Sequence, residues 1–161
     1  ITNLHGGVQA ENISGSVKIE NSFDATRVQQ VGKDLTVKSR HGEVWAEDVR
    51  GSVSIENEYE SIHCGKVDGN LKVWAQHSAV TLEDIKGNIH AETAYDDIRL
   101  ANPSYAEADL KASTSFGSIR GGEEIHLKVS DPGTSQEASV VNGSGNQEIQ
   151  LKNQYGDIRI D

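Results

Sequence analysis

The densest group of side chains that could do chemistry lies just past the middle of the chain. It consists of His90, Glu92, Asp96, Asp97 and Arg99. Paired carboxylates serve as acid and base in enzymes that cleave glycosidic bonds, and carboxylate clusters also bind metal ions. Asp96 and Asp97 are adjacent, however, and successive residues of a strand point to opposite faces. We therefore interpret the group as a charged, solvated surface, with a glycan-active site as the alternative.

A repeat of 18 residues sets the elements that position these side chains. Between residues 17 and 100 the same residue types return in the same columns. One column reads Val17, Leu35, Val53, Leu71 and Ile89. A fixed period near 20 residues with apolar columns is typical of a solenoid, in which each coil buries its apolar face against its neighbours.

Each coil is expected to hold two short strands and two turns. The inward columns alternate at spacing two, at 17 and 19 and again at 26 and 28, which is the period of a strand, and they are apolar except for Thr26. Glycine recurs at one corner, as in Gly51, Gly69 and Gly87, and we expect a positive φ there. The pattern predicts an all-β, single-domain parallel β-solenoid of 18-residue coils.

A left-handed helix of hexapeptide repeats is the rival architecture. It would need an aliphatic residue at every sixth position. Six residues after Ile19 stands Ala25, whose equivalents include Glu43, Ser61 and Asp97. Because this column is polar, the sequence favours a two-sided coil.

A column of flat rings follows the first strand of each coil. His5, His41 and His77 alternate there with Phe and Tyr. Successive histidines would lie two strand spacings apart, about 9.6 Å. Zinc ligands lie about 2.0–2.1 Å from the metal, so two such histidines cannot share an ion. We expect stacked rings here, with no metal and no cofactor. Small polar residues two positions earlier, such as Asn57, are expected to bond the turn backbone.

Two tryptophans occupy outward columns on opposite strands of the coil. An exposed Trp often marks a contact surface. The residues that we expect to contact a partner are Trp45, Trp74, His63, His90, Glu92 and Arg99. The single cysteine, Cys64, falls in an inward column, where it is expected to be a buried, unpaired core residue.

The net charge of the chain limits the kinds of partner that it can bind. The chain has 161 residues and a formal net charge of −10 at pH 7. Phosphate binding needs clustered Lys and Arg, so we expect neither a nucleic acid nor an anionic membrane as partner. No apolar run is long enough to span a bilayer. Because Met is absent even at position 1, we expect a piece of a longer protein whose other segments could include a membrane anchor.

The repeat weakens toward the C-terminus. We expect regular coils over 4–121, with a bulged turn around Pro103 and Tyr105. Residues 122–147 are expected to form an irregular coil with a cap-like excursion, because the uncovered end of a solenoid exposes an edge that promotes aggregation. Residues 148–161 match the repeat again and are expected to form the closing coil.

Two segments of the repeat resemble a known bacterial family. They are residues 51–69, GSVSIENEYESIHCGKVDG, and residues 145–161, GNQEIQLKNQYGDIRID. The family comprises the adhesin-type domains of unknown function that are also grouped as toastrack domains, found in envelope-stress proteins of the Lia and phage-shock type. Tyr155, Gly156, Asp157, Ile158 and Ile160 match its closing motif. The resemblance implies a right-handed β-solenoid that is non-enzymatic and lies outside the cytoplasm or is tied to a membrane segment.

The sequence therefore favours a non-enzymatic, adhesin-like scaffold or interaction module of the cell envelope. It would present a strand face to a protein or glycan partner, as a monomer or with weak self-association. The alternative is a glycan-binding or glycan-cleaving β-helix protein. A self-assembling, bactofilin-like scaffold is a weaker alternative, because the acidic charge and the irregular C-terminal segment oppose stacking.

Overall fold

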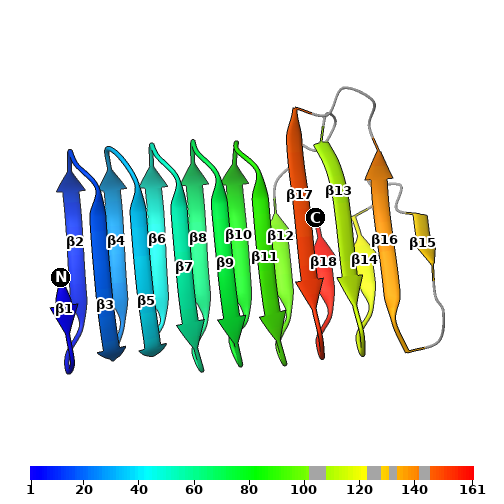
Figure 1. Cartoon of the computed structure of the whole chain (residues 1–161), viewed down its shortest axis with the longest axis horizontal. Coiled ribbons are helices and arrows are strands. Elements are labelled where there is room, and N and C mark those ends of the chain that lie inside the picture. Colours follow the sequence, from blue (N-terminus) through cyan, green and yellow to red (C-terminus); the bar gives the residue numbers. More distant parts are fainter. Residues whose placement is uncertain (102–107, 123–127, 131–133, 142–145) are drawn as a thin grey trace.

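The computed structural model is a β-solenoid whose two sheets face each other across one core (Figure 1). It describes residues 1–101, 108–122, 128–130, 134–141 and 146–161. Sheet A has ten strands and sheet B has eight. These described residues contain no helix, and so none that is long and apolar enough to cross a membrane. The predicted all-β parallel solenoid is confirmed.

Sheets A and B take alternate strands of the chain from β1 to β14, after which β15, β16 and β17 belong to sheet A and β18 to sheet B. Sheet A contains β1 (Thr2–Asn3), β3 (Val17–Phe23), β5 (Leu35–His41), β7 (Val53–Glu58), β9 (Leu71–Gln76), β11 (Ile89–Ala94), β17 (Gln147–Asn153), β13 (Ala108–Thr114), β16 (Gln136–Val141) and β15 (Lys128–Ser130). Sheet B contains β2 (Val8–Ile13), β4 (Thr26–Val31), β6 (Val44–Val49), β8 (Ile62–Val67), β10 (Val80–Ile85), β12 (Ile98–Ala101), β18 (Ile158–Ile160) and β14 (Ile119–Gly121). Val17 pairs with Leu35 and Val80 with Ile98, which confirms the 18-residue coil.

The inward columns form the core. Ile19, Val37 and Ile55 follow one another in one column and are fully buried. Cys64 is also buried, as expected, and burial raises the pKa of its thiol to about 12. Aliphatic stacks of this kind bury apolar area from every coil against the next, which is the main stabilising term of a solenoid.

The glycine corner differs from the prediction. Gly51, Gly69 and Gly87 do not have positive φ values. They are needed for close approach, because a Cβ on Gly87 would lie 2.4 Å from the Gly69 carbonyl oxygen. Left-handed backbone occurs instead at non-glycine positions: at Asp24, at Tyr59, His77 and Tyr95 of the ring column, and in one column of sheet B whose φ values are 52° to 61°. This column consists of Asn12, Gln30, Asp48, Lys66 and Asp84.

The ring column is stacked as predicted. Neighbouring ring centroids lie 4.4–5.6 Å apart and the ring planes differ by 1–14°. The order is His5, Phe23, His41, Tyr59, His77, Tyr95, Tyr155 and Phe116. The expected bonds to the turn backbone are present as well: Asn57 Nδ2 donates to the Glu60 carbonyl at 2.7 Å.

The C-terminal coil does not close the stack. Strand β17 lies between β11 and β13, and β18 lies between β12 and β14, as the red strands of Figure 1 show. Residue 151 faces Ala91 on one side and Ala112 on the other. Residues 148–161 therefore keep the predicted register but occupy an interior position, which corrects the expectation of a closing coil.

The far end of sheet A is covered by two antiparallel strands. Strand β16 pairs with β13, and β15 pairs with β16. These two strands extend sheet A beyond the parallel coils, and the predicted cap-like excursion stays a prediction. The predicted bulge around Pro103 and Tyr105 lies outside the described residues, and the bounds 4–121, 122–147 and 148–161 stay a prediction.

Candidate binding surface

The two tryptophans lie on opposite outer faces of the solenoid, as their columns predict. Trp74 is on β9 of sheet A and is 43% exposed, and Trp45 is on β6 of sheet B and is 38% exposed. The six expected contact residues therefore form two groups. Trp74, His90 and Glu92 share the outer face of sheet A, whereas Trp45, His63 and Arg99 belong to sheet B.

The sheet A group is brought together by strand register. Glu92 on β11 pairs with Trp74 on β9. The His90 ring centroid lies 6.4 Å from that of Trp74, and His90 Nε2 lies 4.0 Å from Glu92 Oε2. On its other side, His90 Nδ1 lies 3.3 Å from Gln150 Oε1. The inserted strand β17 thus continues the surface that starts at Trp74.

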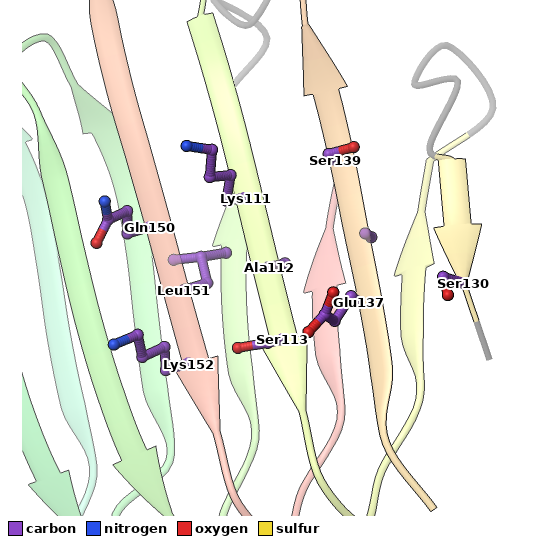
Figure 2. Close-up of a pocket in the computed structure, with 10 residues that line it drawn as sticks. Lys111, Ala112, Ser113, Ser130, Glu137, Ser139, Gln150, Leu151 and Lys152 are labelled. Carbon is purple, nitrogen blue, oxygen red and sulfur yellow. The ribbon is translucent and has the colours of Figure 1, made fainter. Parts of the chain in front are cut away.

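Beyond His90 the outer face of sheet A holds a hollow of about 600 Å³ (Figure 2). It is lined from β13, β15, β16 and β17 by Lys111, Ala112, Ser113, Ser130, Glu137, Ala138, Ser139, Gln150, Leu151 and Lys152. Several of these side chains are short, such as Ala112, Ser113 and Ser139. Figure 2 shows Lys111, Gln150 and Lys152 rising from the neighbouring strands β13 and β17.

These hollow residues were missed in the sequence. Gln150 and His90 are 60 residues apart in the chain, and no local pattern joins them. The matching columns of residues 89–94 and 147–153 gave a signal that these strands are equivalent. That signal did not reveal that the strands are neighbours.

The sheet B group is built around two stacked rings. The Trp45 and His63 rings stack with centroids 3.9 Å apart and planes 23° apart. Glu47 beside them accepts a hydrogen bond from Lys66 Nζ at 2.6 Å, and this bond holds the pKa of the Glu47 carboxyl below its usual range. Arg99 lies two strands beyond His63, on β12, and its Nε donates to Asp161 Oδ2 at 3.0 Å.

The possible catalytic cluster is not assembled. Arg99 is on the opposite sheet from His90 and Glu92. Asp97 Oδ1 accepts a hydrogen bond from the backbone N–H of Asp157 at 2.7 Å, so it braces the neighbouring turn. In the part of the chain that the structure describes, no group of three or more His, Cys, Asp or Glu side chains could hold a metal ion.

Stacked 18-residue coils with polar outer faces place the chain in the class of β-solenoid repeat proteins. The family model for Toastrack DUF4097 domains matches residues 2–161. The chain therefore belongs to this toastrack family, which is a family of domains of unknown function, and its fold suggests a non-catalytic scaffold or interaction module. No curated protein and no solved structure matches the chain.

Proposed function

We propose that this chain is a non-catalytic, adhesin-like interaction module of the bacterial cell envelope that binds a linear glycan on the outer face of sheet A. The observation that carries the proposal is the half-exposed ring of Trp74 on the same face as a hollow of about 600 Å³. An exposed Trp costs free energy in solvent and is common in contact surfaces.

The lining of this face supports a hydroxyl-rich ligand. Ser113, Ser139 and Gln150 each offer both donors and acceptors of hydrogen bonds, and Glu137 offers acceptors. Trp74 supplies an apolar ring a few strands away. Parallel strands repeat at about 4.8 Å. A polymer that crosses the strands would therefore meet equivalent contacts at regular steps.

The envelope location is part of the same proposal. Its support is the family resemblance, which implies a location outside the cytoplasm or next to a membrane segment. A β-solenoid also suits a role in which one rigid face is held out toward a partner, because each coil is braced by its two neighbours.

A protein partner is the second candidate, on the outer face of sheet B. The stacked rings of Trp45 and His63 make a flat, partly apolar surface. Flat surfaces with a central Trp are typical of protein contacts. This candidate uses a different face, so the two can be separated by mutation.

A glycan array with three proteins tests the proposal. Wild type and Trp45→Ala should bind the same set of linear glycans, and Trp74→Ala should lose them while its circular dichroism spectrum and unfolding midpoint stay unchanged. A release assay for reducing ends should give no signal with bound glycans. Absence of any glycan binding by the wild type, or equal loss in both Trp variants, would contradict the proposal.

A further inference from the structure

On the part of the outer face of sheet A formed by β3, β5 and β7, the basic side chains are paired with carboxylates. Each basic side chain on β3 and β5 lies within ion-pair distance of a carboxylate, at 2.9, 2.7 and 3.3 Å. These pairs are Lys18–Glu20, Lys38–Glu56 and Arg40–Glu58. The bond to Glu56 raises the pKa of the Lys38 ammonium above its usual range. This part of the face therefore offers little net charge to a ligand.

On the part of this face formed by β9, β11, β17 and β13, the lysines are not paired in this way with described carboxylates. Lys72, Lys111 and Lys152 form no ion pair with a carboxylate of the described residues. Two of them, Lys111 on β13 and Lys152 on β17, line the hollow (Figure 2). Lys111 pairs in register with Gln150, and Ser113 pairs with Lys152, so the two ammonium groups come from adjacent strands and the same face.

We infer that the hollow binds an acidic sugar, a uronic acid residue of a linear glycan whose carboxylate lies between Lys111 and Lys152. This inference rests on the proposed glycan-binding function of the same face. In a chain of net charge −10, two lysines at one hollow that form no ion pair with the described carboxylates leave two ammonium groups free to bind an anion. An ammonium group acts as a point charge with three donors, which suits a carboxylate approached from two sides.

Nearby acids restrict the ligand further. Glu137 lies across the hollow, in register with Ser113, and Glu92 on β11 lies in register with Lys152 without forming an ion pair with it. A polymer with a negative charge on every unit would meet these carboxylates and be repelled. A glycan in which acidic and neutral sugars alternate would instead put its carboxylates at the lysines and its hydroxyls at Glu92 and Glu137. The expected ligand is therefore a glycan in which acidic and neutral sugars alternate.

Paired oligosaccharides test this inference. One is a linear oligosaccharide of alternating uronic acid and neutral sugar, and the other is the same compound with its carboxyl groups reduced to alcohols. Wild type should bind the acidic form about tenfold more tightly at low salt, because two partly exposed ion pairs supply a modest gain. Added salt should reduce that preference.

Variants assign the preference to the hollow. The double variant Lys111→Gln with Lys152→Gln should bind both forms equally, with the affinity for the reduced form unchanged. The matched control is Lys38→Gln, which lies on the same face but in a closed ion pair, and it should keep the tenfold preference. Trp74→Ala should weaken binding of both forms alike.

The outcomes separate the two claims. Equal binding of both forms by the wild type, or an undiminished preference in the double variant, overturns the acidic-sugar inference and leaves the glycan-binding function standing. No binding of either form, together with an array that shows no glycan at all, overturns both.

Discussion

Replacing Leu151 by Ala tests the inserted position of the C-terminal coil. Leu151 is 1% exposed, and its neighbours in the inward column are Ala91 on β11 and Ala112 on β13. One large side chain thus fills the space beside two small ones. The substitution would leave three alanines in consecutive coils, and none of them could fill the gap.

The expected loss of stability follows from this packing. Removing three buried carbons costs about 2.4 kcal/mol at roughly 0.8 kcal/mol for each. The unfilled cavity adds to that cost, so we expect a total of about 3–5 kcal/mol. Leu35→Ala is a matched interior control, because Leu35 is 1% exposed and β5 is paired on both sides. Leu4→Ala is the control for an exposed end, because Leu4 is 62% exposed, and it should change stability by less than about 0.5 kcal/mol.

Urea unfolding followed by circular dichroism gives the free energy of unfolding of each of the three variants. Amide hydrogen exchange adds the local view, since an interior β17 should be protected as strongly as β9, whereas a terminal coil would fray. If Leu151→Ala behaved like Leu4→Ala, and β17 exchanged quickly, the inserted arrangement would be wrong. A loss equal to that of Leu35→Ala would support it.

Three further predictions concern single positions. Gly42→Ala should destabilise the fold by about 1–3 kcal/mol, because its Cβ would meet the Asp24 carbonyl oxygen, whereas Gly15→Ala has open space and should be neutral in the same urea titration. Hydrogen bonds from Ser118 lower the pKa of the Asp157 carboxyl, so its contribution is present above its ordinary pKa and is lost as the pH falls through the lowered value. Unfolding midpoints between about pH 2 and pH 6 should therefore fall more steeply in the wild type than in Asp157→Asn. Cys64 should resist alkylation in the native state and react at full rate in urea, and rapid native labelling would contradict its burial.

The columns of the sequence were sufficient to predict the coil. Each column holds either inward or outward side chains, because the parallel register places equivalent residues of successive coils next to one another. Ile19 and Ile55 were therefore recognisable as core, and Trp74 as outward, without coordinates. The same logic failed at Gly69 and Gly87, because a column of glycines has two physical causes. Positive φ was expected, and close backbone contact between coils is the observed one.

The order of the coils could not be predicted in the same way. Residues 147–153 satisfy the column pattern at any level of the stack, because the pattern specifies register and not the neighbour. The structure shows one feature that fits β17 to its level, which is the size of the side chains in the adjacent coils. Leu151 fits between Ala91 and Ala112, and this match becomes visible only once all three are in contact.

The inserted coil also explains why the candidate surface exists. Without β17, Gln150 would not stand beside His90 nor Lys152 beside Glu92, and β13 would not be held at its present distance from β11. The hollow thus combines side chains from separate segments of the chain, so local sequence motifs could not reveal it. Its two lysines come from β13 and from β17, and their proximity depends on the pairing of these two strands. The proposed recognition at this face would therefore be coupled to the packing of the C-terminal coil, and a change that loosens Leu151 in the core would also move the lysines on the surface above it.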